Sequence, residues 1–207
     1  VSTSYRQEQN PTPGRHELIF PMFEFEAPGN FEDLLQMEND LCKFLGFKAK
    51  NERNPYTEDF PGGMYQSVLA KYTGAELDAG HEEEMYKEYG DVFFLTYFPE
   101  STSPFWNMKL GKDDVKKTGK HANKCDVIIG GMETIGSAER GTVPDQMRHQ
   151  FHTISDGGYA ELLYDLFGKE RVEAELQEFL KHDFIPRYGG GIGITRLIAG
   201  MKKAGLM

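Results

Sequence analysis

The sequence predicts an α+β domain built on an antiparallel sheet flanked by helices. Candidate strands come first, whereas the pattern from Pro144 onward is largely helical. The two kinds of element do not alternate as βαβ units, which argues against a parallel sheet. With 207 residues, of which 39% are hydrophobic and 13% aromatic, the chain is long enough for one domain with a substantial core.

The N-terminal region predicts two strands. Residues 1–10 match the end of a strand that runs into a turn, and residues 10–14 (NPTPG) supply the turn chemistry. Residues 16–26 alternate toward their end, so Phe23 and Phe25 are expected on one face of a sheet. The residues expected on the other face are Met22, Glu24 and Glu26.

A helix is predicted over residues 31–47. Ala27-Pro28-Gly29 ends the preceding strand, and Asn30 stands where a helix N-cap belongs. Hydrophobic residues recur at helical spacing and are expected to face the core. They are Leu34, Met37, Leu41, Phe44 and Leu45.

The rest of the chain divides into short elements. In the middle we expect a loop at 48–63, helices at 64–72 and 80–89, strands at 91–97 and 105–110, a charged loop at 112–124, and an apolar strand at 125–129 that continues toward Glu133. The last third predicts helices at 144–154, 158–167 and 169–182, a glycine-rich turn at 189–193 and a final helix at 194–204.

Charge and cysteine content exclude several classes of protein. The formal charge of −10 argues against broad non-specific binding to nucleic acid, which needs stripes of Lys and Arg. Two cysteines, Cys42 and Cys125, cannot build a disulfide framework and have no metal-ligand spacing. No apolar run reaches the roughly 20 residues that a membrane helix needs, and we expect a cytoplasmic protein.

The glycine-rich segment 188–197 (YGGGIGITRL) is the most specific local signal. Glycines let a backbone approach a ligand closely, and the N-terminus of the helix that follows attracts anions. Arg196 adds a cation in the first turn of that helix. The alternative is a tight loop with Arg196 on the surface.

Charged residues near the N-terminus form a second signal. Arg6 and Glu8 lie two apart on a strand and therefore project to one face. Arg15 and His16 follow across a hairpin loop, before the strand that carries Phe20 and Glu24. A buried ion pair is the alternative explanation.

The third signal is a pair of carboxylates followed by an arginine. Asp126 and Glu133 lie near the ends of apolar strands, where they could hold Mg²⁺ together with substrate phosphates. Gly136 and Arg140 follow, and the arginine could bind a substrate carboxylate with both arms of its guanidinium. The alternative is a salt bridge between Arg140 and Glu133 or Glu139.

Taken together and in this order, these motifs resemble class II aminoacyl-tRNA synthetases of the aspartate/asparagine type and the related ammonia-dependent asparagine synthetases. The segments at Tyr97-Phe98-Pro99 and Pro104-Phe105-Trp106 agree as well. The resemblance spans nearly the whole chain and implies the fold of that family. It also implies that residues 1–207 are most of a catalytic core, which in this family is preceded by a first motif and followed by a C-terminal tail.

The resemblance implies a role for each motif residue. Arg6 and Arg196 would be the catalytic arginines on the phosphates of ATP, and Asp126 and Glu133 would hold Mg²⁺. The amino acid would be bound by Glu24, Gly136 and Arg140. The residues implied to bind ATP are Arg6, Glu8, Arg15, His16, Phe20, Gly191, Gly193 and Arg196.

The implied activity is an ATP-dependent ligase that forms an aminoacyl-adenylate. Thr195 stands where the synthetases usually carry an acid, which favours asparagine synthetase acting on aspartate, ammonia and ATP. Met22-Phe23-Glu24 is more similar to asparaginyl-tRNA synthetase, so an asparaginyl- or aspartyl-tRNA synthetase core, with tRNA as partner, is the alternative. A non-catalytic paralogue acting as a binding module ranks third. The family implies a homodimer.

Two histidine-containing segments are not assigned to the site. His81-Glu82-Glu83-Glu84 is expected to be a solvated helix face. His149 and His152 share a helix face but have no third metal ligand nearby in sequence, so a structural role is expected. Phe105 and Trp106 are expected in the core of the sheet.

Overall fold

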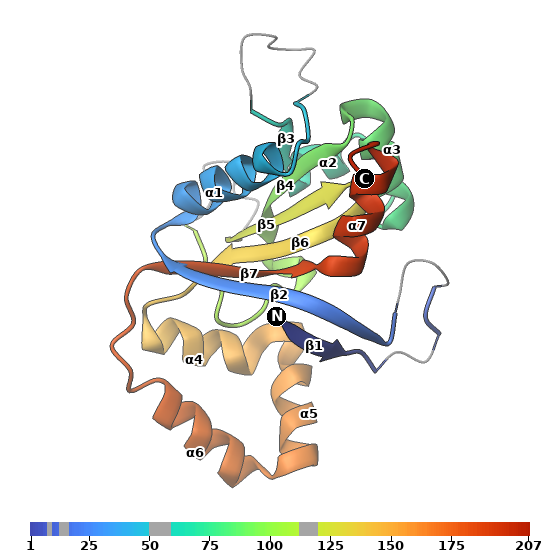
Figure 1. The fold of residues 1–207 in the computed structure, drawn as a ribbon. Coiled ribbons are helices and arrows are strands. Elements are labelled where there is room, and N and C mark those ends of the chain that lie inside the picture. Colours follow the sequence, from blue (N-terminus) through green and yellow to red (C-terminus); the bar gives the residue numbers. More distant parts are fainter. Residues whose placement is uncertain (8–9, 13–16, 50–58, 112–119) are drawn as a thin grey trace.

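The computed structural model describes residues 1–7, 10–12, 17–49, 59–111 and 120–207. In this part of the chain, strands form one sheet of seven in the order β1-β2-β7-β6-β5-β4-β3 (Figure 1). All neighbouring pairs are antiparallel except β3 and β4, which confirms the predicted fold class. The strands are β1 (Ser2–Tyr5), β2 (Ile19–Pro28), β3 (Gly62–Met64), β4 (Val92–Pro99), β5 (His121–Ile129), β6 (Met132–Glu139) and β7 (Arg187–Gly193).

The helices agree closely with the predicted ranges. They are α1 (Phe31–Phe44), α2 (Tyr65–Leu69), α3 (Ala79–Tyr89), α4 (Pro144–Thr153), α5 (Gly158–Phe167), α6 (Lys169–Phe179) and α7 (Ile194–Lys203), with 3₁₀ turns at Glu100–Thr102 and Ile154–Gly157. None of the helices in the described residues is both long and apolar enough to cross a membrane.

Helix α1 begins at the predicted cap. The Asn30 side chain accepts a hydrogen bond from the Asp33 N–H at 3.1 Å, and the Asp33 carboxylate accepts one from the Asn30 N–H at 2.9 Å. This capping box satisfies two backbone donors at the helix start. Phe44 does not face the core as predicted: it stands two residues, more than half a helical turn, after the buried Cys42, and its side chain is 87% exposed.

The prediction of one strand continuing from Cys125 toward Glu133 is wrong. Strand β5 begins earlier, at His121, inside the expected charged loop, and a turn at Gly130-Gly131 separates it from β6. Both turn glycines have positive φ, +60° and +85°, as a tight two-residue hairpin turn requires. The two strands therefore lie side by side and antiparallel.

Two other sequence predictions need correction. Residues 105–110 do not form a strand of the sheet, because only Met108 and Leu110 make isolated bridges there. The glycine-rich segment expected as a turn is strand β7, paired along its length with β2 and with β6. Glycines disfavour strands in isolation, but pairing on both edges holds this segment extended.

Helices cover the two faces of the sheet unequally. On one face, α1 and α7 pack on β5, β6 and β7 in a core that includes Leu34, Val127 and Ile135. On the other face, α2 and α3 pack on β4 and β5 through residues such as Met85 and Ile128. Because α2 and α3 cover only one end of this second face, β2, β7 and part of β6 stay open there.

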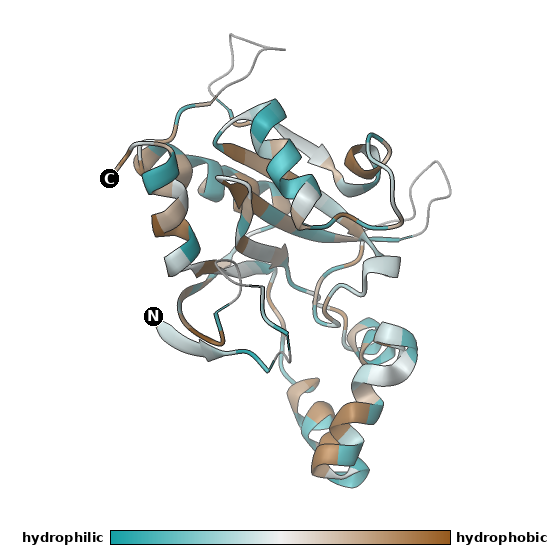
Figure 2. Cartoon of the chain, turned by 90° about the vertical axis from the view of Figure 1, so that its right-hand side faces the viewer, coloured by the Kyte–Doolittle hydropathy of each residue, from teal (hydrophilic) through white to brown (hydrophobic). Residues whose placement is uncertain are grey.

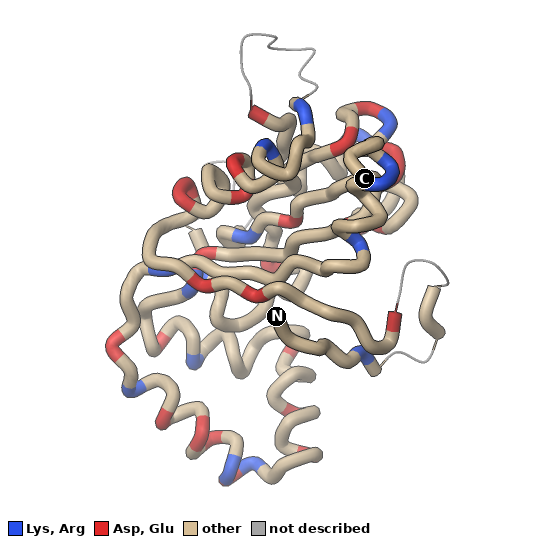
Figure 3. Tube along the Cα trace, viewed as in Figure 1, with Lys and Arg blue, Asp and Glu red and all other residues tan. Residues whose placement is uncertain are grey.

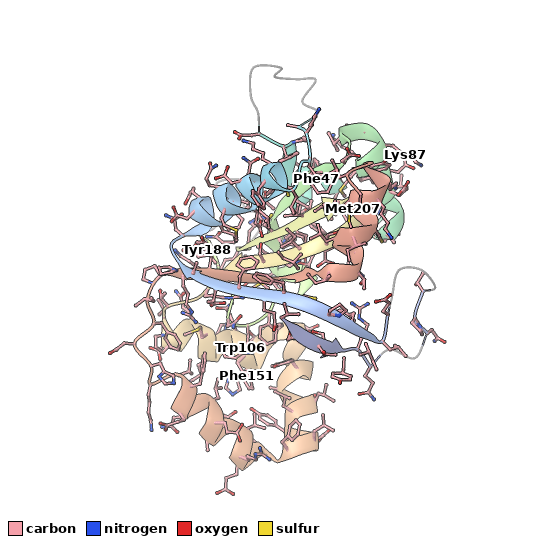
Figure 4. The ribbon with its side chains drawn as sticks, viewed as in Figure 1. Phe47, Lys87, Trp106, Phe151, Tyr188 and Met207 are labelled. Atoms are coloured by element: carbon pink, nitrogen blue, oxygen red, sulfur yellow. The ribbon has the colours of Figure 1, made fainter. Side chains whose placement is uncertain are left out.

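Helices α4 to α6 gather at one end of the molecule, apart from α1, α3 and α7 (Figure 1). They enclose a separate apolar cluster, and Figure 2 shows hydrophobic residues both in the middle of the sheet and along these helices. Trp106 belongs to this cluster rather than to the sheet core predicted for it. The centre of its ring lies 5.5 Å from that of Phe151. Figure 4 labels both residues beside α4.

Candidate active site

A row of residues crosses the open face of the sheet from β2 to β5. Glu24 pairs with Gly191, Gly191 with Gly136, and Gly136 with Asp126. Directly paired residues of neighbouring strands share a face. The two glycines therefore form a floor without side chains of its own between a carboxylate on β2 and a carboxylate on β5, and the end of the Met22 side chain reaches over Gly191.

This floor belongs to a cavity of about 640 Å³, a size typical of small-molecule sites. Nine of the predicted site residues line it: Arg6, Phe20, Glu24, Glu133, Gly136, Arg140, Gly191, Gly193 and Arg196. Asp126 lies beside it, because its Oδ1 is 3.7 Å from where a Cβ on Gly136 would stand. The predicted ATP contacts Glu8, Arg15 and His16 lie outside the described residues.

Cations flank the floor at one end. The Arg6 guanidinium stacks over the Phe20 ring at 5.4 Å from the ring centre, an arrangement favoured by the charge distribution of the ring. Arg196, in the first turn of α7, donates from Nη1 to the Glu133 carbonyl at 2.6 Å. Thr195 and Gly193 line the same end, beside the N-terminus of that helix. This end of the cavity suits a polyanion.

Three consecutive glycines, Gly189, Gly190 and Gly191, let strand β7 lie close to the strands on both sides of it. A Cβ on Gly190 would lie 2.6 Å from Ser137 Cβ and 2.7 Å from the Gly136 carbonyl oxygen. A Cβ on Gly189 would lie 2.7 Å from the Phe25 carbonyl oxygen. The glycines therefore allow close approach of backbones in a strand, not in the turn that the sequence predicted.

Two carboxylates converge on the same point of the floor. An ideal Cβ on Gly136 would be 3.1 Å from Glu133 Oε1 and 3.7 Å from Asp126 Oδ1. Burial raises the pKa of Asp126 to about 7. The ion-paired Lys124 ammonium lowers this pKa, whereas the nearby Glu133 carboxylate raises it further. No sequence motif pointed to Lys124, although its place two residues before Asp126 puts both side chains on one face of the strand.

These carboxylates fit a hydrated divalent cation bound together with substrate. Asp126 Oδ1 is buried, and none of the described residues donates a hydrogen bond to it. The described part of the chain contains no group of three or more His, Cys, Asp or Glu side chains arranged around a metal. Mg²⁺ commonly takes one or two carboxylates plus substrate phosphates and water, so the pair suits Mg²⁺ better than a metal that needs a full protein cage.

Arg140 follows the end of β6, at the end of the cavity away from Arg6, and Glu24 borders the glycine floor. The Arg140 guanidinium binds both oxygens of the Glu26 carboxylate, with Nε to Oε1 at 3.3 Å and Nη2 to Oε2 at 3.4 Å. Arg187 also contacts Glu26 Oε1, at 3.1 Å. Neither alternative salt bridge predicted for Arg140 forms: Glu139 binds Lys109 at 2.7 Å, and the Glu133 carboxylate lies over Gly136. Ser2 donates to Glu24 Oε2 at 2.7 Å.

None of the described residues His81, His149 and His152 lines this cavity. His152 contacts Glu173 through Nε2 and the Arg148 carbonyl through Nδ1, both at 2.7 Å, which is a structural role. The acidic run on α3 is only partly solvated as expected. Glu82 is half-buried and its Oε2 accepts a hydrogen bond from the Glu133 backbone N–H at 2.8 Å, a contact that no sequence pattern indicated.

Comparison with solved structures supports the fold. The asparaginyl-tRNA synthetase from Pyrococcus horikoshii complexed with asparaginyl-adenylate superposes with a TM-score of 0.68 at 21% identity, over 96% of this chain and 48% of that one. The asparaginyl-tRNA synthetase from Entamoeba histolytica with the same adenylate gives 0.70 at 21%, over 98% and 48%. The aspartyl-tRNA synthetase from that organism gives 0.68 at 19%, over 99% and 44%.

Sequence comparisons point to the same group of proteins as the structural comparisons. A curated aspartate–tRNA(Asp) ligase from Pyrobaculum aerophilum is 25% identical over 128 residues, which is 62% of this chain and 26% of that protein. The chain thus spans about a quarter of the curated relative and about half of the similar solved structures. The family model described as tRNA synthetases class II (D, K and N) matches residues 1–205. The chain belongs to this family of class II tRNA synthetases.

Proposed function

We propose that this chain is the catalytic core of an ATP-dependent ligase that activates aspartate as a β-aspartyl-adenylate, which ammonia then converts to asparagine. The observation that carries the proposal is the content of one cavity. Arginines at one end, converging carboxylates at the centre and an arginine that already holds a carboxylate at the other end share a single face of the sheet.

In the proposed reaction an oxygen of the side-chain (β) carboxylate of aspartate attacks the α-phosphorus of ATP. The new P–O bond forms as the bond to the bridging oxygen breaks, and pyrophosphate leaves with the electron pair. Arg6 and Arg196, which line the cavity, would bind the phosphates and stabilise the negative charge that builds up. Alignment and charge do the work, so no side chain of the protein needs to act as a nucleophile.

The second half-reaction needs an amine nucleophile. Ammonia attacks the carbonyl carbon of the adenylate, AMP leaves, and one proton is released. Thr195 lines the cavity next to Arg196, and its neutral hydroxyl, where the synthetases usually carry an acid, supports the amidating activity.

Mg²⁺, when bound, would neutralise phosphate charge and make pyrophosphate a better leaving group. Asp126 and Glu133 would hold it, since their oxygens meet over Gly136. The ammonium of Lys124 keeps Asp126 from being an isolated buried charge.

Arg140 supports aspartate as the amino acid. Its guanidinium faces both oxygens of the Glu26 carboxylate, and a substrate carboxylate has the same shape and charge. Glu24, across the glycine floor, is suited to an α-ammonium group.

A second function is an asparaginyl- or aspartyl-tRNA synthetase core, in which the adenylate passes to tRNA. The similar proteins are asparaginyl- and aspartyl-tRNA synthetases, which favours this function, as does the Met22-Phe23-Glu24 strand. A non-catalytic paralogue is the third possibility, and the retention of Arg6, Phe20, Asp126, Glu133 and Arg196 disfavours it. Homodimeric assembly and a cytoplasmic location accompany either enzyme by family resemblance.

One experiment separates these functions. The protein is incubated with ATP, Mg²⁺ and aspartate, together with either ammonium or tRNA, and pyrophosphate release and the product are measured. Free asparagine supports the amidating enzyme and charged tRNA supports the synthetase. Parallel reactions with asparagine in place of aspartate identify the amino acid. The absence of pyrophosphate release with either amino acid would refute both enzymatic functions.

A further inference from the structure

Strand β6 contains an irregularity next to the carboxylate site. Val127 pairs with Ile135, but the next residue, Ile128, pairs with Glu133, so Thr134 is an extra residue on β6. Such a β-bulge changes which face the following side chains point to. In a regular strand, Glu133 and Gly136, three residues apart, would lie on opposite faces.

The bulge therefore decides whether Glu133 reaches Asp126. With the extra residue, Glu133 pairs with Ile128, which shares a face with Asp126. Its Oε1 accordingly stands 3.1 Å from the Cβ position of Gly136. The converging carboxylates exist only as long as this local backbone geometry holds.

Two side chains from different helices hold the Glu133 backbone at this point. Glu82 of α3 accepts a hydrogen bond from the Glu133 N–H at 2.8 Å. Arg196 of α7 donates to the Glu133 carbonyl at 2.6 Å. Both are hydrogen bonds to charged groups, which are stronger than neutral ones.

Helix α3 is firmly placed against the hairpin that leads into β6. Lys203 Nζ donates to the Gly130 carbonyl at 2.8 Å and pairs with Glu83 at 3.2 Å. A Cβ on Gly131 would be 3.4 Å from Glu83 Cα, so the turn lies directly on the helix backbone. Glu84, by contrast, is exposed and pairs with Lys87 on its own helix.

We propose that Glu82 is a positioning residue for the site: its hydrogen bond to the Glu133 backbone keeps the bulge in the form that directs the Glu133 side chain toward Asp126. The backbone contact itself is independent of any reaction. Its consequence for Mg²⁺ rests on the proposed function, so the two are tested separately.

The backbone contact is tested by hydrogen exchange at the Glu133 amide. Glu82→Gln keeps a side-chain oxygen that can accept the hydrogen bond, whereas Glu82→Met has similar length but no such oxygen. We expect E82M to speed exchange at Glu133 by about tenfold or more, and E82Q to stay near wild type. Glu84→Met is the matched control on the same helix and leaves this amide protected. Unchanged exchange in E82M, or equal acceleration in E84M, would overturn the proposal.

The consequence for the site is tested by titrating Mg²⁺ in the presence of a non-hydrolysable ATP analogue and following binding by calorimetry. Loss of a residue that orients a metal ligand commonly lowers metal affinity by about 10- to 100-fold, so E82M should need about tenfold more Mg²⁺ and E82Q about the wild-type amount. Equal weakening in E82Q and E82M would mean that the charge of Glu82 matters and not its hydrogen bond, which contradicts the proposal.

Two further outcomes are distinguishable. If the wild-type protein shows no Mg²⁺-dependent binding of the analogue, the proposed function fails, while the exchange experiment still decides the role of Glu82. If E82M does not fold, Glu82→Ala takes its place. Restored protection in E82Q but not in E82A supports the positioning role, and similar exchange in the two overturns it.

Discussion

Replacing Arg140 with alanine is the sharpest test of the amino-acid end of the cavity. In the structure this guanidinium faces the Glu26 carboxylate through Nε and Nη2 at 3.3 and 3.4 Å. The Arg140 side chain is 18% exposed and that of Glu26 is 47% exposed. If the arginine binds a substrate carboxylate, its loss should impair amino-acid use far more than it impairs stability.

The expected losses of stability and of kcat/KM depend on how far Arg140 and its partners are exposed to water. The pair with Glu26 is half open to water, so screening limits its contribution to stability to about 0–1 kcal/mol. A charged hydrogen bond to a bound substrate contributes roughly 1.5–3 kcal/mol, which is a factor of about 10 to 150 in kcat/KM. We therefore expect R140A to lower kcat/KM for aspartate by that factor while the protein stays folded.

The assay is pyrophosphate exchange as a function of aspartate concentration, with ATP binding measured separately by calorimetry. ATP affinity should be unchanged, because Arg6 and Arg196 lie at the other end of the cavity. Arg140→Lys is the matched variant; it keeps the charge but loses the planar fork and should recover only part of the activity. An unchanged KM and kcat for aspartate in R140A would refute the placement of the amino acid at this end.

Three further predictions concern the fold. Gly190→Ala should lower the free energy of unfolding, measured in urea, by about 1–3 kcal/mol, because the new Cβ would lie 2.6 Å from a side-chain carbon of β6. Gly191→Ala is the control, because its Cβ meets only the flexible end of a methionine side chain and should cost less stability. Equal losses of stability in the two variants would contradict this reasoning. Burial raises the pKa of Glu38 from 4.5 to about 8, so between these pH values the folded protein keeps a proton that the unfolded chain releases. The free energy of unfolding should therefore fall as the pH rises from about 4.5 to about 8. Glu38→Gln should therefore become more stable relative to wild type as the pH rises across that range. If the free energy of unfolding changed with pH in the same way in both proteins, Glu38 would not be neutral in the folded state. Phe151→Ala should cost about 3–5 kcal/mol through the cavity it leaves. The protein's single tryptophan, Trp106, lies 5.5 Å away and reports the unfolding by fluorescence, and a loss below 1 kcal/mol would mean that the cluster repacks.

The helices were predictable because their signals are local. Asn30 and Asp33 cap α1 at the predicted residue, and the helices after Pro144 begin and end within a few residues of their predicted limits. Helix formation depends on neighbours three or four residues apart, which a sequence displays directly. The alternation of β2 is also a local signal. It correctly predicts that Phe23 and Phe25 lie on one face of the sheet and Glu24 on the other.

The pattern of charged residues predicts less about the site than the helix and strand patterns predict about the fold. Figure 3 shows acidic and basic residues interspersed along α3 and α6, and nothing in that pattern marks one acid of α3 as different from its neighbours. Glu82 meets the Glu133 backbone and Glu84 meets solvent, although both stand in one acidic run. The difference depends on how α3 docks against β6, and residues 51 apart in sequence meet there.

The sequence by itself therefore determined the helices, the alternation of β2 and, by resemblance, the residues that gather around the cavity. Only the tertiary structure decided that the glycine-rich segment is a strand, that Glu133 reaches Asp126 through a bulge, and that Glu82 holds that bulge. The physical reason is that strand pairing and side-chain facing are set by contacts between distant segments. One extra residue, Thr134, reverses which face the side chains of β6 point to, and its effect becomes visible only once β5 lies beside it.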